Sequence, residues 1–335
     1  MNSRYGVVVA MLLSALCLAS GTALAQTITM KLSTSTSGDA INEWMRLLKQ
    51  GIEARAPGKM KIEIYPASQL GAIPRTIEGV AMGTIELSMN ASGFYESVEP
   101  RFSVFAAPGL FDDIYHANRI LTDPEIKKRL ATFGAPKGVE ALSMFTPSSY
   151  AILSHKPIAT LADLKGQKIR VPGSPLQIEA LKRFGVAPIS MAFGEVLPAL
   201  QNRTIDGVWA AIPLFNALKY YDVAKFATNL PSSLAVGVGL VNRNFMKSLG
   251  PELEAIVRDE AGKADTMVLP WAAEEITRSQ KAWAQNGGKE LNLSAADAKR
   301  FLDESVIATA PLLTATPQQK EDYQALDAAA KKYRK

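Results

Sequence analysis

The sequence predicts an α/β protein of two units of similar build, braced by one long helix. Three observations support this prediction. Short β-prone stretches alternate with amphipathic helical stretches over residues 28–89, which is typical of a parallel or mixed sheet with helices on its faces. The alternation restarts after about residue 148. A helical pattern of about 35 residues then begins at Pro251 and would reach about 50 Å, enough to contact both units.

The first unit starts with a β-prone stretch over residues 28–32. Asp39 is a suitable N-cap for the next helix, in which apolar residues recur at helical spacing as far as Ile52. The residues Ala56-Pro57-Gly58 end that helix, and apolar residues then alternate with charged ones over 60–64, as in a half-buried strand. A helix over 73–82 and a strand over 85–89 complete the unit.

The second unit follows the same order, and a final strand over 236–242 leads back to the first unit. Pro270 is expected to kink or split the long helix. We therefore assign residues 26–148 plus about 237–275 to lobe I, and 149–236 plus about 276–335, with the C-terminal helices, to lobe II. The expected elements of the second unit are strands over 150–153, 169–171 and 205–209, a helical turn over 161–164, and helices over 176–184 and 195–201.

The first 25 residues have the composition of a cleaved secretory signal peptide. A short basic start precedes an apolar run from Val7 to Leu18, and the small residues Ala23 and Ala25 follow at the positions that a signal peptidase reads. The run is too short for a stable membrane span, so an uncleaved anchor is the lesser alternative. Cleavage would remove Cys17 and leave 310 of the 335 residues without a cysteine, which excludes disulfides, thiolate metal sites and a cysteine nucleophile.

Charge and motif content argue against nucleic-acid binding and against catalysis. The formal net charge of +5 falls to +4 without the one basic residue of the signal, and acidic and basic residues are interspersed. The two histidines, His116 and His155, stand in separate segments with no partner at metal-ligand spacing. Motifs typical of nucleotide binding, zinc proteases and serine hydrolases are missing. We therefore expect a protein without enzyme activity, cofactor, metal site or nucleic-acid partner.

One charged residue stands out in the second unit. In the stretch GQKIRVPGSP, Arg170 lies near the end of a short apolar strand and is followed by proline and glycine. Such an arginine can be a structural residue paired with an internal acid such as Glu195 or Asp206. It can also be the one charged group of a cleft, placed to hold an anion. The residue alone fits both interpretations.

An ordered series of motifs resembles the solute-binding proteins of tripartite ATP-independent periplasmic (TRAP) transporters. The resemblance covers essentially the whole mature chain, and the motifs occur in the order and at the spacings of the family. In the second half they are Asp163–Pro172, Gly185–Pro188, Met191–Val196, Ala199–Gln201 and Asp206-Gly207, and in the first half Gly58-Lys59, Tyr65–Gly71 and Ala107–Phe111.

This resemblance implies a two-lobed periplasmic-binding-protein fold, type II-like, with a mixed sheet flanked by helices in each lobe. It also implies a periplasmic protein that closes on an organic acid and delivers it to TRAP permease subunits in the membrane. A binding protein that feeds a sensor and, less favoured, an exported hydrolase are the alternatives. In the family, the arginine matching Arg170 makes a bidentate pair with the substrate carboxylate, for which the planar guanidinium fork is suited.

The chain departs from the family pattern at two places. Many members have a second arginine twenty positions before the first, where this chain has Tyr150. Many have Asn-Pro shortly after the Asp-Gly, where this chain has Ala210-Ala211, preceded by Trp209. Because a cation and an amide are replaced by apolar and aromatic groups, we expect a monocarboxylate with an apolar or aromatic body, unless Trp209 simply packs in the core.

Ligands with a second acidic or keto group stay open, because Arg75, Lys219 or backbone amides can take a second charge. C4-dicarboxylates and 2-keto acids are therefore the alternative ligand classes. The correspondence with the family adds further candidates for ligand contacts, with a plain turn as the alternative for Ser35 and a core position as the alternative for Phe193. They are Ser35 after the first strand, Asn90 and Ala91 at the end of the strand over 85–89, Gly173 and Ser174 after Arg170, then Phe193 and Ala210.

Overall fold

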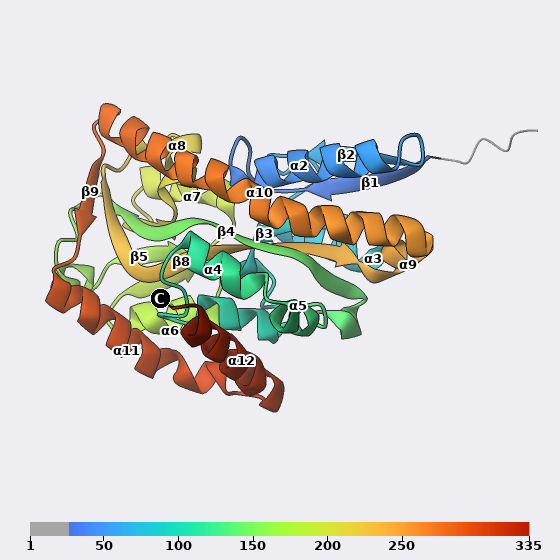
Figure 1. Ribbon diagram of the computed structural model, residues 1–335. Helices are drawn as coiled ribbons and strands as arrows, with labels where there is room; N and C mark the ends of the chain where they lie inside the picture. Colours follow the sequence, from blue (N-terminus) through green and yellow to red (C-terminus); the bar gives the residue numbers. More distant parts are fainter. Residues whose placement is uncertain (1–26, 335) are drawn as a thin grey trace, which may run out of the picture.

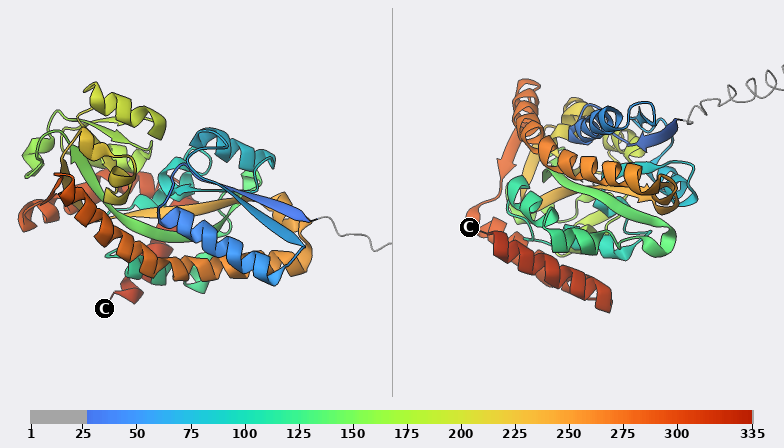
Figure 2. Two further views of the ribbon diagram at one scale, coloured as in Figure 1. Left: turned by 90° about the horizontal axis from the view of Figure 1, so that it is seen from above. Right: turned by 45° about the vertical axis from the view of Figure 1, so that its right-hand side comes forward.

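Two long antiparallel strands, β4 (Val139–Ser154) and β8 (Phe226–Asn242), run from one half of the molecule into the other. A computed structural model describes residues 27–334, and it shows an α/β protein whose two lobes are joined by these strands (Figure 2). The predicted two-lobed fold is thus confirmed. The predicted signal peptide lies outside the described residues.

Lobe I contains a parallel group of strands next to the crossing strands. The sheet order is β2-β1-β3-β8-β4-β7-β5-β6, with β9 also paired to β8. Strand β1 pairs in parallel with both β2 and β3, whereas β3 is antiparallel to β8. The elements of this part are β1 (Ile28–Ser33), α2 (Ala40–Arg55), β2 (Met60–Tyr65), α3 (Ile73–Met82) and β3 (Leu87–Ala91), at or close to the predicted ranges.

Lobe II repeats the arrangement on the other side of β4. Strand β5 is parallel to both β6 and β7, and β7 is antiparallel to β4. The elements of this part are β5 (Lys168–Val171), α6 (Pro175–Lys182), β6 (Ala187–Ser190), α7 (Phe193–Gln201), β7 (Gly207–Ala210) and α8 (Ile212–Ala217).

The two crossing strands differ from the prediction, which treated their segments as short separate strands. Pro147 lies inside β4 and Pro231 inside β8, each followed by two serines. The pairing register shifts between Phe145 and Ser148 and again before Ala151. Prolines in strands are confined to edges and bulges, so these breaks in the ladder explain how the strands continue through sequences that indicate turns.

Helix α10 (Gly250–Gln285) extends along both lobes (Figure 1). It packs on α2 in lobe I and on α8 in lobe II. Leu253 and Val257 belong to the apolar core around α2, whereas Trp283 belongs to the core of lobe II. The expected long bracing helix is therefore present. Of the two effects expected of Pro270, a kink or a split, the split is wrong, because the helix is continuous through this exposed residue.

The C-terminal helices contact both lobes. Helix α11 packs on α6, whereas α12 packs on η2, α4 and α5, in the segment assigned to lobe I. The buried Asp322 of α12 accepts hydrogen bonds from Arg101 Nε at 2.6 Å and from Arg129 Nη1 at 2.9 Å. The lobe boundaries remain a prediction, and this ion cluster joins α12, assigned to lobe II, to two arginines of the segment assigned to lobe I. The remaining elements are η1 (Ser92–Phe94), η2 (Pro100–Ala106), α4 (Ile114–Leu121), α5 (Pro124–Leu130), η3 (Ala135–Lys137), η4 (Leu161–Leu164), η5 (Tyr220–Asp222), α9 (Arg243–Ser248), β9 (Lys289–Asn292), α11 (Ala295–Leu313) and α12 (Pro317–Tyr333).

A buried carboxylate fastens α10 to α2 and β4. Asp265 Oδ1 accepts hydrogen bonds from Trp44 Nε1 at 2.9 Å and from the Ser143 hydroxyl. Its other oxygen lies 3.8 Å from Lys127 Nζ and has no hydrogen-bond partner in the described chain. Burial raises the pKa of Asp265 from the ordinary 3.8 to about 7, against the opposing effect of Ser143 and Lys127.

The raised pKa of Asp265 predicts a pH-dependent free energy of unfolding. The unfolded chain releases this proton near pH 3.8 and the folded chain near pH 7, so the folded state loses stability as the pH rises between these values. In Asp265→Asn that contribution is removed. We expect the free energy of unfolding of the variant, relative to the parent, to rise from pH 4 to pH 8 in urea titrations. A pH-independent difference would contradict the assignment.

Candidate ligand-binding site

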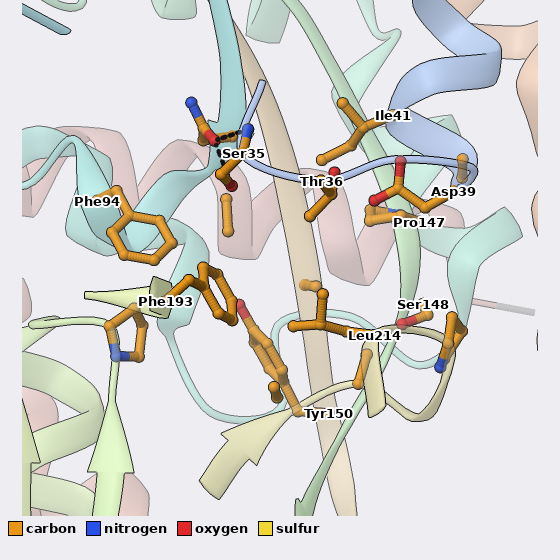
Figure 3. A pocket seen from close by; sticks show the side chains of 18 of the residues that line it. Ser35, Thr36, Asp39, Ile41, Phe94, Pro147, Ser148, Tyr150, Phe193 and Leu214 are labelled. Carbon is orange, nitrogen blue, oxygen red and sulfur yellow. Dashed lines mark hydrogen bonds between the residues drawn. The ribbon is translucent and has the colours of Figure 1, made fainter. Parts of the chain in front are cut away.

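A cavity of about 100 Å³ lies between the lobes, where β4 and β8 pass from one to the other. The carboxyl ends of strands β1, β3, β5 and β7, with the segments that directly follow them, supply most of its wall, in keeping with ligand binding at the carboxyl ends of strands. Figure 3 shows Phe94 and Phe193 on one side of the cavity, with Asp39 and Ile41 on the other. Eight of the ten predicted contact residues line it: Ser35, Asn90, Ala91, Tyr150, Arg170, Phe193, Trp209 and Ala210.

Arg170 is buried in this wall, with 1% of its surface exposed. It lies on β5 between Ile169 and Val171, whose buried side chains point to the opposite face of the strand because side chains alternate. Its Nε and Nη2 atoms donate to the carbonyl oxygen of Met191 at 2.9 and 2.8 Å. These two bonds fix the plane of the guanidinium and leave Nη1 without a hydrogen bond in the described chain.

The Arg170 guanidinium has no acidic partner within salt-bridge distance among the described residues. The pairing with Glu195 or Asp206 that the sequence left open is therefore contradicted. Glu195 accepts from the amide of Ala192, and Asp206 accepts from the amide of Lys168.

Two aromatic rings from opposite lobes lie beside this cation. The guanidinium carbon is 4.4 Å from the ring centre of Phe193 and 5.8 Å from that of Phe94. The two rings are 5.7 Å apart, which places a contact between η1 and α7 next to the arginine. Burial lowers the pKa of Arg170 to about 10, so the group stays charged at neutral pH. Cation–π contact compensates part of the cost of burying it.

Tyr150 and Trp209 form a second aromatic pair in the wall. Their rings meet edge to face with centres 5.9 Å apart, on the neighbouring strands β4 and β7. Trp209 is 4% exposed and its indole Nε1 has no hydrogen-bond partner in the described chain. The indole belongs both to the cavity wall and to the core of lobe II, and its contact with a ligand remains a prediction.

On the lobe I side, the cavity wall contains two polar residues, Ser35 and Asn90, that are hydrogen-bonded to each other. The Ser35 hydroxyl and amide donate to Asn90 Oδ1 at 3.0 and 3.3 Å. Asn90 Nδ2 donates in turn to the Ser88 hydroxyl at 2.9 Å, which fixes the orientation of the amide. The loop after β1 is thereby tied to the end of β3.

Two predicted contacts are not in the cavity. Gly173 and Ser174 fall outside its wall, because the chain turns away from it after Pro172. Gly173 has φ +97°, which favours glycine, and an added Cβ would lie 3.0 Å from Ser190 Oγ. Ser174 is fully buried, and a Cβ added at Gly93 would lie 3.3 Å from its Cβ.

Charged residues in the wall were only partly foreseen. Arg75 and Lys219, proposed for a second anionic group, are absent from the wall, and Arg170 is the basic residue among those that line it. Asp39 and Glu275 line it as well, and the sequence analysis missed both as site residues. The carboxylate of Glu275 accepts from the amide of Ala40 at 3.0 Å, although 235 positions separate the two residues.

A two-lobed chain with a cavity between its lobes has the build of an extracellular solute-binding protein. Residues 32–308 match the family model DctP, described as bacterial extracellular solute-binding protein, family 7. The chain belongs to this family.

Relatives and solved structures agree with this membership. The chain is 31% identical over 225 residues to the 2,3-diketo-L-gulonate-binding periplasmic protein YiaO of Escherichia coli, covering 67% of this chain and 68% of the relative. It is 25% identical over 280 residues to the C4-dicarboxylate-binding periplasmic protein DctP of Vibrio cholerae, covering 83% and 76%. The fold matches a TRAP periplasmic solute-binding protein of Desulfovibrio salexigens, crystallised with orotic acid, with a TM-score of 0.88 at 24% identity, covering 92% and 100%.

These proteins are solute-binding proteins and not enzymes. Over residues 27–334, the structure contains no helix with the length and apolar character of a membrane span. The same part of the chain contains no group of three or more side chains arranged to hold a metal ion.

Proposed function

We propose that this chain captures an organic acid between its lobes, with the carboxylate on Arg170, and delivers it in the periplasm to a TRAP membrane permease. The observation that carries the proposal is a buried, charged guanidinium in the cavity wall that no acidic side chain of residues 27–334 neutralises. An unpaired buried charge is costly, and a carboxylate ligand supplies the missing partner. Known ligands of family members, including diketogulonate and C4-dicarboxylates, carry such a group.

The remaining affinity must come from the body of the ligand. Charge-assisted hydrogen bonds contribute about 1.5–3 kcal/mol each, and micromolar binding needs roughly 8 kcal/mol. Most of the wall is apolar or aromatic, formed by residues such as Ile41, Phe94 and Trp209. We therefore propose a monocarboxylate with an apolar or aromatic body. A cavity of about 150 Å³ holds benzene, so an aromatic ring would require small side-chain shifts here.

Thermal unfolding with a panel of organic acids tests the proposal. An acid at a hundredfold its dissociation constant should stabilise the chain by about 2.7 kcal/mol. Trp209→Ala should weaken binding of an aromatic acid such as benzoate much more than binding of pyruvate, because a short acid cannot reach the indole. Trp271→Ala, outside the cavity, is the control. If no acid raises the melting temperature, the proposed function is wrong.

A further inference from the structure

We propose that the ligand is a zwitterion, with a cationic nitrogen group at the end away from its carboxylate, received by Asp39 and Glu275. This inference rests on the proposed function, in which Arg170 holds the carboxylate. It assigns a second contact region in the same cavity, and it narrows the ligand to acids in which an apolar body separates the two charges.

The cavity has a basic end and an acidic end. Arg170 packs against Phe193 and Phe94, which Figure 3 shows on one side, whereas Asp39 lies on the other side. Glu275 adjoins Asp39, because its Oε2 accepts from the amide of Ala40, the next residue in the chain. Both acids line the cavity that Arg170 lines, and neither is within salt-bridge distance of it.

Each of the two acids has one carboxylate oxygen that accepts no hydrogen bond from the described chain. Asp39 Oδ1 accepts from the amide of Asn42 at 3.1 Å and from its Nδ2 at 2.7 Å, while Oδ2 makes no hydrogen bond in the described chain. Glu275 Oε1 likewise makes none, although the residue is only 8% exposed. Two acceptors therefore remain available at the same end of the cavity.

No side-chain cation of the described chain pairs with these carboxylates. The arginine nearest to Glu275 in sequence, Arg278, bonds Glu274 at 3.2 Å and lies over the ring of Trp271 at 5.1 Å. Burial, reinforced by the neighbouring Asp39, raises the pKa of Glu275 to about 8. A cation placed between the two acids would favour the ionised form of Glu275 and lower this pKa, as a carboxylate ligand would favour the charged form of Arg170 at the other end.

Capping of α2 explains only part of the arrangement. Asp39 is the N-cap and satisfies the first turn through Asn42, which is the ordinary role of such a residue. The cap does not require a second carboxylate from a distant helix. Glu275 is such a carboxylate: it is buried, it lines the cavity, and one of its oxygens has no hydrogen-bond partner in the described chain. An apolar residue at position 275 would cover the same surface without burying a carboxyl group.

Matched acids that differ at one end provide the test. Three sets share a carboxylate and a spacer and end in an ammonium, a methyl or a second carboxylate group. They are γ-aminobutyrate, valerate and glutarate; ε-aminocaproate, enanthate and pimelate; and para-(aminomethyl)benzoate, para-ethylbenzoate and para-(carboxymethyl)benzoate. Dissociation constants are measured by calorimetry at neutral pH. In at least one set, we expect the ammonium member to bind about tenfold or more tightly than both of its partners.

Two variants assign the effect to the acidic end. Glu275→Gln and Asp39→Asn keep the size of each side chain, and asparagine also retains capping ability. Each should reduce the preference for the ammonium member over the methyl member about tenfold. Glu252→Gln, exposed on the same helix, is the matched control and should change nothing. Circular dichroism confirms folding of each variant.

The outcomes separate the two proposals. If methyl or dicarboxylate members bind as well as ammonium members, the zwitterion inference is overturned and the carboxylate function stands. If the preference persists in both variants, the assignment of Asp39 and Glu275 is overturned. If no member of any set binds but another acid of the thermal panel does, the zwitterion inference is overturned, and if no acid of either panel binds, the carboxylate function itself fails.

Discussion

Arg170→Lys is expected to weaken ligand binding by about a hundredfold or more while the protein stays folded. Lysine keeps the charge but loses the planar fork, so it cannot hold Met191 O and a carboxylate at once. Loss of one or two charge-assisted bonds, at about 1.5–3 kcal/mol each, corresponds to a factor of roughly ten to ten thousand. Calorimetric titration with whichever acid gives the largest thermal shift measures this loss.

A matched arginine on the same lobe provides the control. Arg183 is half-exposed and pairs with Glu304 away from the cavity, so Arg183→Lys should bind normally. Arg170→Ala should bind no better than Arg170→Lys. Normal binding by either Arg170 variant would show that the carboxylate contacts another part of the wall.

Gly207→Ala is expected to destabilise the fold by about 2–3 kcal/mol, a large effect for one methyl group. Gly207 begins β7 between β4 and β5, and an added Cβ would lie 2.4 Å from the carbonyl oxygen of Leu153. That atom belongs to the backbone, so a side-chain rotation cannot relieve the clash and the strands must separate. Urea titration measures the free energy of unfolding.

Gly194→Ala, thirteen positions earlier, is the companion variant. An added Cβ there meets nothing within 4 Å, and the residue lies in helix α7. Alanine is favoured over glycine in a helix, so this variant should be as stable as the parent or more stable by up to about 1 kcal/mol. If the two substitutions changed the free energy of unfolding equally, the close approach of Gly207 to the Leu153 carbonyl would not be what excludes a side chain at position 207.

Local periodicity predicted most of the fold, because helices such as α2 and strands such as β2 carry their burial pattern in a few residues. Local periodicity failed where the structure depends on pairing between segments that are far apart in the sequence. The segments around Pro147 and Pro231 have turn-like composition, yet each continues a long strand because the two segments pair with bulges. Nothing within either segment indicates its partner.

The basic end of the cavity was predictable and the acidic end was not. Arg170 belongs to a motif series whose order is visible in the sequence, and Tyr150 and Trp209 stand where the chain departs from the family pattern. Glu275 instead reaches the cavity because α10 crosses the start of α2, and in the sequence it is one of many charged residues on a long helix. Its role depends on a contact that only the tertiary structure shows.

The continuity of α10 has a mechanical consequence for opening and closing. One end of this helix is anchored in the core of lobe I and the other, through Trp283, in that of lobe II, so rotation of the lobes has to flex it. Pro270 has no amide hydrogen to donate to the carbonyl of Thr266. Bending the helix at this point therefore breaks one backbone hydrogen bond fewer than bending it elsewhere. Helix α10 is therefore stiff along most of its length and bends most easily at Pro270. The energy needed to bend it becomes part of the free energy that ligand binding must supply to keep the lobes closed.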